Sequence, residues 1–163
     1  MPAMQKITPC LWFDAQAEEA AKFYTAIFQN SRIVSVTRYG EAGHDVYGRP
    51  TGTVMLAAFE LEGQALTALN GGPVFTFNEA IPFQVSRETQ EELDYIWEKL
   101  SEGGDEQAQQ CGWLKDRYGV SWQVVPTVLP EMLQDANAET SQRVMKAMLQ
   151  MKKNGHRNTQ AVL

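Results

Sequence analysis

Apolar positions along this 163-residue chain follow two different spacings, and the same pair of spacings occurs twice. A short apolar stretch begins at Ile7 and leads into a segment whose apolar residues lie three and four positions apart, and the same order begins again at Ala80. Short apolar stretches predict strands, and a spacing of three to four predicts an amphipathic helix. The stretches ITPCLWFDAQAEEAAKFYTAI and AIPFQVSRETQEELDYIWEKL align without a gap, so the chain contains an internal repeat of a strand, a turn and a helix.

The helix of the second copy has clear ends in the sequence. Thr89 is followed three residues later by Glu92, and this capping box satisfies two backbone amides at a helix start. The next turns place four apolar residues on one face: Leu93, Ile96, Trp97 and Leu100. Gly103 and Gly104 end the helix, because glycine readily adopts the left-handed conformation of a C-terminal cap.

The first helix is expected to start after Asp14 and to end near Asn30, with these apolar residues on its buried side: Ala20, Phe23, Tyr24, Ile27 and Phe28. Each helix is followed by alternating segments that predict three strands. In the first copy these strands are Arg32–Tyr39, Thr53–Leu61 and Gln64–Leu69, the last two joined by the hairpin turn Glu62-Gly63. In the second copy they are Gln107–Gly112, Trp113–Lys115 and Val120–Val125.

The order of one strand, one helix and three strands therefore occurs twice. It predicts an α+β fold in which two βαβββ modules pair into one large curved mixed sheet, with helices on the outer face and a cleft on the concave face. We place the first module at residues 5–75, the second at 78–128 and a C-terminal helical tail at 129–163, all within a single domain. A slip of one residue in any strand would exchange the cleft-facing side chains for the helix-facing ones.

Two further segments lie outside the repeat. The glycine-rich stretch Gly40–Gly52 interrupts the first copy, and we expect it to be a mobile loop and a candidate lid. In the tail, Thr140–Met151 places Val144, Met148 and Met151 on one face of a helix. This face could pack on a second subunit, so the tail is one candidate for an assembly element.

Composition narrows the classes of function. The chain is 44% hydrophobic and 21% charged, as ordinary globular proteins are. Its net charge of -6 and the lack of a basic patch argue against nucleic-acid binding and against binding to anionic membranes. No apolar run approaches the roughly 18 residues of a membrane span. Cys10 and Cys111 are fewer cysteines than a disulfide-stapled secreted domain usually has, so we expect a cytoplasmic location.

The repeat, together with LNGGPVFTFNEAI, TQEELDYIWEKL and CGWLKDRYGVSWQVVP, resembles one group of proteins. It is the PhnB-like, or 3-demethylubiquinone-9 3-methyltransferase-like, branch of the vicinal oxygen chelate superfamily, which includes glyoxalase, extradiol dioxygenases and bleomycin-resistance proteins. The resemblance covers about residues 5–151. It implies the glyoxalase/bleomycin-resistance-like pairing of βαβββ modules and a homodimer.

In metal-using relatives of this branch, the ligands come from the first and last strands of each module and are histidine, glutamate or sometimes glutamine. The matching positions in this chain are Thr8, Leu69 or Asn70, Ala80 or Ile81, and Gln123. None of them is a histidine or a carboxylate, and neutral oxygen donors bind transition metals weakly. The sequence therefore predicts no metal site, and it indicates no other cofactor.

Gln123 lies where metal-using relatives have a carboxylate, and two interpretations of its amide stay open. It could anchor a ligand through hydrogen bonds, or neighbouring backbone and water could satisfy it within the fold. The tryptophans of the strands are likewise either sheet core or a platform for a flat, aromatic ligand. The predicted ligand-binding residues are Thr8, Cys10, Trp12, Asn70, Gln84, Cys111, Trp113 and Gln123.

These residues favour a protein that binds a small aromatic or quinone-like molecule without a metal. The sequence leaves open whether the protein is also an enzyme. The resemblance implies demethylubiquinone methyl transfer or metal-dependent chelate chemistry as alternatives, and Cys10 or Cys111 could act as a nucleophile. A third interpretation is a protein whose dimer surface matters more than its cleft.

Overall fold

The computed structural model describes residues 5–153 and residue 155. The chain divides into two compact units, Met1–Thr76 and Phe77–Leu163, which we call the first unit and the second unit. Both units mix strands with helices, so the predicted α+β class is confirmed. None of the helices in these described ranges is long and apolar enough to cross a membrane.

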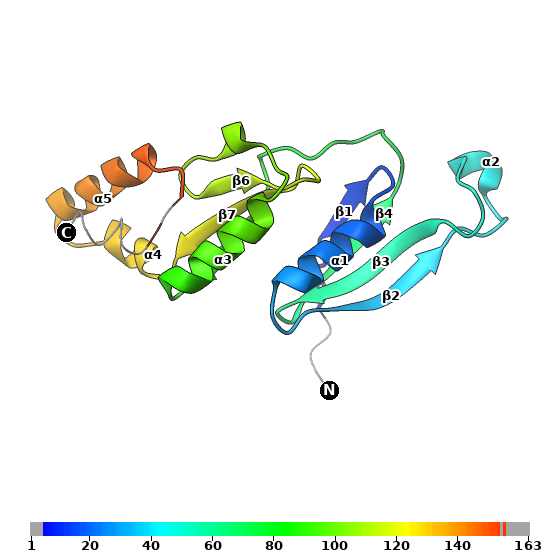
Figure 1. Cartoon of the computed structure of the whole chain (residues 1–163), viewed down its shortest axis with the longest axis horizontal. Helices are drawn as coiled ribbons and strands as arrows, with labels where there is room; N and C mark the ends of the chain where they lie inside the picture. The colour runs from blue at the N-terminus through cyan, green and yellow to red at the C-terminus, as the bar shows by residue number, and fades with distance from the viewer. Residues whose placement is uncertain (1–4, 154, 156–163) are drawn as a thin grey trace. The chain divides into compact units, whose positions relative to one another are not determined.

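The first unit follows the predicted order of strand, helix and three strands, with one additional short helix (Figure 1). Its elements are β1 (Cys10–Phe13), α1 (Ala17–Ile27), β2 (Arg32–Arg38), α2 (His44–Tyr47), β3 (Val54–Leu61) and β4 (Gln64–Asn70). The strands form one sheet in the order β1-β4-β3-β2. β1 pairs with β4 in parallel, whereas β3 pairs with β4 and with β2 in antiparallel orientation.

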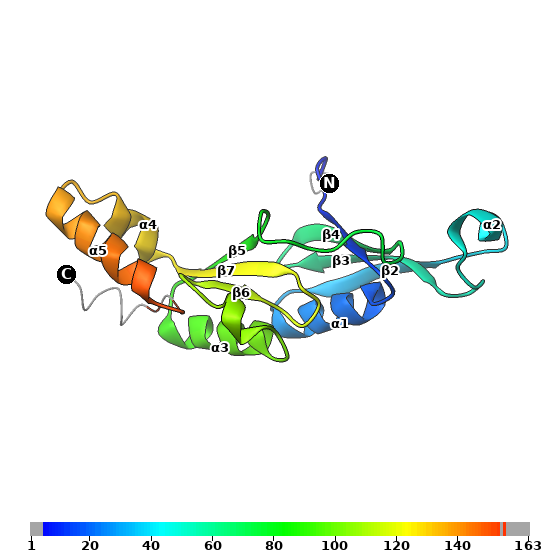
Figure 2. The ribbon, with the colours of Figure 1, turned by 90° about the horizontal axis from the view of Figure 1, so that it is seen from above.

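Helix α1 covers one face of this sheet (Figure 2). Leu11 and Phe13 of β1 and Phe59 of β3 are buried. The helix buries small residues and one ring: Ala17, Ala20, Ala21 and Tyr24. The rings of Tyr24 and Phe59 stack with their centroids 6.3 Å apart. Because side chains alternate along a strand, the residues between these buried positions point to the opposite face of the sheet.

Two turns of the first unit can be compared with their predictions. The hairpin between β3 and β4 is confirmed, with Glu62 and Gly63 both at positive φ, 49° and 85°, as a tight turn between twisted strands requires. Helix α1 ends at Ile27 instead of near Asn30, because Phe28 is already extended at φ -85° and ψ 137°. The chain then reverses at Asn30, whose φ is 48°.

The second unit begins with the same strand and helix and then differs from the first. Its elements are β5 (Phe83–Arg87), α3 (Gln90–Ser101), the 3₁₀ turn η1 (Glu106–Ala108), β6 (Trp113–Lys115), β7 (Ser121–Pro126), α4 (Val128–Leu133) and α5 (Ala138–Gln150). The strands form a sheet in the order β5-β7-β6. Helix α3 starts with the predicted capping box of Thr89 and Glu92 and buries all four predicted apolar residues.

The predicted strand Gln107–Gly112 is wrong. The Asp105 side chain accepts a hydrogen bond from the Gln107 amide and closes a 3₁₀ turn there. Gln110 then forms an isolated bridge with Trp113, and Cys111 has a φ of 53°, which a strand does not allow. A polar segment with a local side-chain acceptor therefore forms a turn where the first unit has a strand.

The tail forms a helical hairpin instead of a single helix. Helix α4 was not predicted, and α5 occupies nearly the predicted range. Val144 of α5 is 1% exposed and packs in a cluster with Val125, Leu129 and Met132, while Met148 is partly buried against the same cluster. After α5 the chain returns to the sheet, where the Cys111 amide donates to the Met151 carbonyl at 2.8 Å. The apolar face of the tail helix thus packs within its own chain.

Candidate functional site

The face of the first sheet opposite helix α1 carries several predicted site residues. Cys10 pairs with Thr67, and Trp12 pairs with Leu69, in the β1–β4 register. Cys10 is exposed and Trp12 is half-buried, as expected for positions that alternate with the buried Leu11. Thr8 is exposed and precedes β1. The predicted parity of β1 is therefore the one observed.

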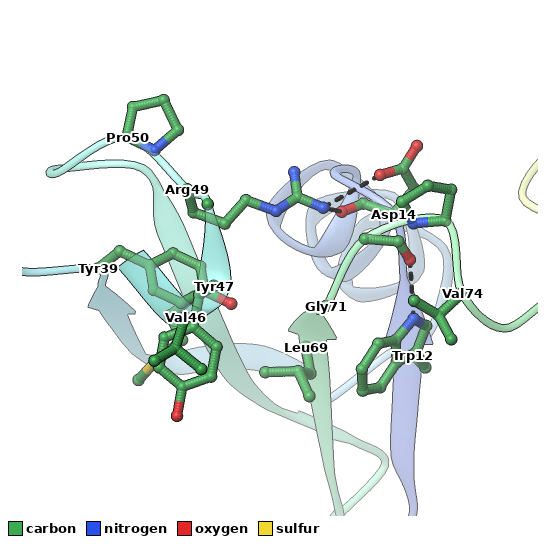
Figure 3. A pocket seen from close by; sticks show the side chains of 14 residues that line it. Trp12, Asp14, Tyr39, Val46, Tyr47, Arg49, Pro50, Leu69, Gly71 and Val74 are labelled. Carbon is green, nitrogen blue, oxygen red and sulfur yellow. Dashed lines mark hydrogen bonds and ion pairs between the residues drawn. The ribbon is translucent and has the colours of Figure 1, made fainter. Parts of the chain in front are cut away.

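A cavity of about 740 Å³ opens at the end of this face where β1 and β4 finish. Its walls come from three places: the ends of β1 and β4, the loop around α2, and the segment after β4. The labelled lining residues in Figure 3 are Trp12, Asp14, Tyr39, Val46, Tyr47, Arg49, Pro50, Leu69, Gly71 and Val74. Tyr39, Val46 and Tyr47 lie on one side and Trp12 and Val74 on the other, with Leu69 between them (Figure 3).

The Trp12 indole is held in one position. Its Nε1 donates to the Gly72 carbonyl at 2.9 Å, and the Phe75 ring meets it edge-on at 4.9 Å between centroids. A Cβ at Gly71 would overlap the Trp12 ring, so residue 71 must be glycine for this arrangement. The side wall that Trp12 provides is therefore preorganised by the fold.

The opposite wall is built from two tyrosines. Tyr39 is buried, and its hydroxyl donates to the Asn70 carbonyl at 2.5 Å, which ties the start of the loop to the end of β4. Tyr47 in α2 lies with its ring centroid 5.9 Å from that of Tyr39 and inclined by 41°. The Tyr47 side chain is 63% exposed, so most of its ring is available to a molecule in the cavity.

Arg49 connects the loop to the end of β1. Its Nη2 donates to the Asp14 carbonyl at 2.7 Å and to the Asp14 carboxylate at 3.1 Å (Figure 3). The other guanidinium nitrogens of Arg49 have no hydrogen-bond partner among residues 5–153 and 155. The Gly40–Gly52 stretch, predicted as a candidate lid, contains the four-residue helix α2. Its residues Val46, Tyr47 and Arg49 contribute one wall of the cavity.

Asn70 points away from this face. It is buried, its Oδ1 accepts from the Ala17 amide at 2.8 Å, and its Nδ2 donates to the Val54 carbonyl at 3.0 Å. The Asn70 side chain thus accepts from the first backbone amide of helix α1, because Gln16 at the N-cap position makes no side-chain cap hydrogen bond. The Asn70 amide is therefore engaged with the backbone, whereas the sequence predicted it as a ligand contact.

The tryptophans and predicted ligand-binding residues of the second unit lie in three places: one face of the second sheet, its opposite face and a turn. Gln84, Gln123 and Trp113 share one face of the second sheet, since Gln123 pairs with Gln84 on one side and with Trp113 on the other. The Gln84 Nε2 donates to the Gln123 Oε1 at 3.0 Å. Trp122 lies on the opposite, buried face, and Cys111 lies in the turn that contacts the tail.

The donor atoms at the metal positions implied by the resemblance do not suit a divalent metal. Thr8 and Gln123 offer neutral oxygen atoms, Leu69 is apolar, and the Asn70 amide is engaged with the backbone. Within the described part of the chain, no three histidine, cysteine, aspartate or glutamate side chains come together in a way that could hold a metal ion. Neutral donors of this kind bind transition metals weakly.

The sequence model of one protein family, described as 3-demethylubiquinone-9 3-methyltransferase, matches residues 5–125. The chain belongs to this family. The PhnB protein from Bacillus cereus, whose solved structure carries the same methyltransferase name, is 40% identical; the match covers 76% of this chain and 100% of that one, with a TM-score of 0.64. The predicted resemblance is therefore confirmed, and helices α4 and α5 lie outside the residues that the family model matches.

More distant structures share the fold of this family. A protein from Pseudomonas aeruginosa is 21% identical with a TM-score of 0.57, and the match covers 74% of this chain and 96% of that one. The fosfomycin resistance protein FosX from Listeria monocytogenes is 14% identical with a TM-score of 0.55, and the match covers 83% and 100%. These likenesses support the glyoxalase/bleomycin-resistance-like fold alone. No curated protein sequence is similar enough to this chain to count as a match.

Sequence reasoning missed several residues that line the cavity of the first unit. Tyr39 was predicted only as the end of a strand, and Tyr47 and Arg49 lie in the stretch predicted as a lid. Leu69 was considered for a metal position and not as an apolar wall. The available signal was a pair of tyrosines, with Tyr39 just before the glycine-rich stretch and Tyr47 inside it, because such loops often carry binding residues.

Proposed function

We propose that the protein binds a small, flat aromatic or quinone-like molecule in the cavity of the first unit, without a metal. The observation that carries this proposal is the pair of facing walls, with the Trp12 indole on one side and the Tyr39 and Tyr47 rings on the other. A volume of about 740 Å³ is in the range of cavities that hold small organic ligands. Aromatic rings on two walls favour a flat ligand that contacts their faces or edges.

Arg49 supplies the polar contact in this proposal. Its guanidinium has hydrogen-bond donors beyond those used by Asp14, and its side chain is 22% exposed at the cavity wall. The Asp14 carboxylate already balances the positive charge of Arg49. An uncharged carbonyl oxygen of a ligand therefore suits the remaining Arg49 N–H donors better than a second carboxylate does. A quinone has a carbonyl of this kind on a flat ring. Cys10 and Thr8 remain proposed contacts at the open face of the same sheet.

The test is a titration with tetramethyl-benzoquinone, which has no free ring position that could react with the exposed Cys10 thiol. Cyclohexanedione, which is saturated but has two carbonyls, is the matched compound. We expect the quinone to shift the Trp12 indole N–H signal in an NMR spectrum of the full chain, and the saturated ring to leave it unchanged. Equal shifts with both compounds, or none with either, would overturn the proposal.

A matched pair of variants locates the binding. Tyr47→Ala removes one wall and should weaken quinone binding roughly threefold to tenfold, as expected for the loss of one aromatic contact. Tyr95→Ala removes a tyrosine that is 43% exposed on α3, outside the lining of the cavity, and should not change the affinity. The proposed site is wrong if both variants bind as the wild-type protein does.

The metal-independent part of the proposal has a separate test. Elemental analysis of purified protein, followed by titration with zinc, nickel and manganese, should give no stoichiometric metal, and quinone affinity should be the same with and without a chelator. One metal ion per chain would instead favour the metal-dependent chemistry that the resemblance implies.

A second candidate function is catalysis, and the family match favours it. The Bacillus cereus relative carries the name of a methyltransferase that acts on demethylubiquinone. If this chain transfers a methyl group, incubation with S-adenosylmethionine and a catechol acceptor should release S-adenosylhomocysteine. If the wild-type protein releases S-adenosylhomocysteine faster than the Tyr47→Ala variant does, the protein is an enzyme and not only a binding protein.

We also infer that the protein is a cytoplasmic homodimer. The dimer is supported by family membership and by the exposed apolar side chains of Val74, Phe75 and Ile81 after β4. The cytoplasmic location is supported by the cysteine content, because Cys10 and Cys111 are fewer cysteines than a disulfide-stapled secreted domain usually has. Sedimentation velocity of the full chain should show one species of twice the chain mass, and Ile81→Ser should shift it toward the monomer.

A further inference from the structure

A second cavity, of about 310 Å³, lies within the second unit where the sheet meets the tail hairpin. Gln84 and Gln123 line it from β5 and β7. The apolar part of the lining comes from the end of β7 and from the tail hairpin: Val125, Leu129, Pro130, Leu133 and Met148. Gln134, the C-terminal cap of α4, also contributes to the lining. The cavity therefore has the Gln84–Gln123 pair at one edge and a mainly apolar wall from the hairpin.

The polar edge has a definite hydrogen-bonding pattern. The Gln84 Nε2 donates to the Gln123 Oε1 at 3.0 Å, which leaves the Gln84 Oε1 as an acceptor and the Gln123 Nε2 as a donor. Within residues 5–153 and 155 neither of these two atoms makes a further hydrogen bond. If both amides were turned over, the roles would exchange, and one acceptor and one donor would still remain on this pair of side chains.

The cavity is uncharged. Among the residues that the structure describes, its lining contains no lysine, arginine, aspartate or glutamate. A charged ligand would give up part of its hydration against the apolar wall without meeting an opposite charge, which is costly. An uncharged ligand with an apolar body loses little, because Leu129, Leu133 and Met148 provide apolar contacts.

The tail hairpin that completes this cavity is firmly attached. Val144 and Val125 belong to one buried cluster, and the segment after α5 hydrogen-bonds to Cys111 and Gly112 at 2.8 Å each. Both helices lie beyond residue 125, where the match to the family model ends. The apolar wall is thus an addition to the part of the chain that defines the family.

We propose that this cavity binds a small uncharged molecule in which an amide or lactam group is attached to an apolar body. The ligand carbonyl accepts from the free glutamine N–H, and the ligand N–H donates to the free glutamine carbonyl. The apolar body lies against the α4 and α5 side chains. A primary amide or a lactam has its donor and acceptor adjacent on one edge, which matches the pair of free groups on Gln84 and Gln123.

The test uses the lactam carbostyril as the probe and its N-methyl derivative as the matched compound. The N-methyl group removes the donor and retains the ring and carbonyl. We expect carbostyril to shift the side-chain amide signals of Gln84 and Gln123 in an NMR titration of the full chain. The N-methyl derivative should bind roughly threefold to tenfold more weakly, as the net loss of one hydrogen bond predicts. Equal affinity of the two compounds, or no shift with either, would overturn the inference.

Variants separate this site from the one proposed for the first unit. Gln84→Met keeps the length of the side chain and removes its amide, and should weaken carbostyril binding about tenfold. Gln64→Met, at an exposed position of β4, should leave the affinity unchanged. Tyr47→Ala should also leave it unchanged. If Tyr47→Ala abolishes carbostyril binding or Gln84→Met does not weaken it, the inference fails, whatever the outcome of the quinone titration.

Discussion

Helices α1 and α3 occupy matching positions in the two copies of one repeat, but their first turns are satisfied in different ways. Helix α3 carries its own cap, because the Thr89 hydroxyl accepts from the Glu92 amide and Glu92 reaches back to Thr89. Helix α1 has no side-chain cap at Gln16. Its first amide, at Ala17, is satisfied by Asn70, which lies 53 residues further along the chain.

The same contrast appears in what each unit adds to the repeat. The first unit inserts the loop around α2 between β2 and β3, and this loop becomes one wall of a cavity. The second unit has a turn in place of one strand and adds the α4–α5 hairpin after β7. A repeat in sequence therefore predicts the shared framework, while the candidate binding sites lie where the two copies differ.

The largest effect is expected at Asp116, which holds the turn between β6 and β7 by local contacts. Asp116 is 3% exposed, and its carboxylate accepts from the Trp122 Nε1 at 2.8 Å and from the amides of Tyr118 and Val120 at 2.8 and 3.1 Å. Asp116→Ala would leave buried donors without this acceptor and should lower the free energy of unfolding by about 3 kcal/mol. Urea denaturation measures the change.

Asp116→Asn is the matched control for this prediction, because it keeps one carbonyl acceptor in the same place. Asp116→Asn should lower the free energy of unfolding by less than Asp116→Ala does. Two separate unfolding transitions, with the loss confined to one of them, would show that the second unit depends on its local contacts alone. A loss below about 1 kcal/mol for the alanine variant would contradict the importance of this network.

An intermediate effect compares the two helix caps directly. Asn70→Ala removes the acceptor for Ala17 and the donor to Val54 inside the first unit, and should cost about 2 kcal/mol. Thr89→Ala removes an exposed cap and should cost about 1 kcal/mol. The measurement is urea denaturation of both variants beside Asn78→Ala, an exposed position that should change stability little. If Thr89→Ala lowers the free energy of unfolding more than Asn70→Ala does, the local cap of α3 contributes more stability than the distant cap of α1, contrary to this prediction.

The smallest effect concerns carboxylates on the surface of each unit. The hydrogen bond from Lys22 and the charges of Lys22 and Arg38 lower the pKa of Glu18, against a smaller opposing effect of burial. In the second unit, the hydrogen bond from Lys115 lowers the pKa of Glu79. A carboxylate with a lowered pKa stabilises the fold above its ordinary pKa of 4.5, and this contribution is lost as the pH falls through the lowered value.

The Glu18 prediction is tested by the pH dependence of the free energy of unfolding. Between about pH 6 and pH 3 the wild-type protein should lose slightly more stability than Glu18→Gln, because the variant has no carboxylate to protonate at this position. Lys22→Gln should reduce the same slope. Identical slopes for all three proteins would show that this ion pair contributes nothing measurable, as many surface pairs do.

Local patterns predicted much of the framework. The capping box of α3 with its buried face and the Glu62-Gly63 hairpin were predicted from the sequence, and the structure has both of them. These features depend on residues within a few positions of one another, or on simple alternation along a strand. The family was also predicted from the sequence and is confirmed by the match to residues 5–125.

Other features were decided only by the tertiary structure. The role of Asn70 as a cap for α1, the turn at Glu106–Ala108 and the hairpin of α4 and α5 were not predicted. Neither were the walls of the two cavities, which place Trp12 opposite Tyr47 in one lining and bring Gln123 and Met148 into the other. Each of these features joins residues that are far apart along the chain or, as at Glu106–Ala108, depends on a local side-chain hydrogen bond that competes with strand formation. Periodicity and capping motifs report contacts between residues that are close in sequence. A binding cavity is instead formed by residues that only the folded chain brings close together in space.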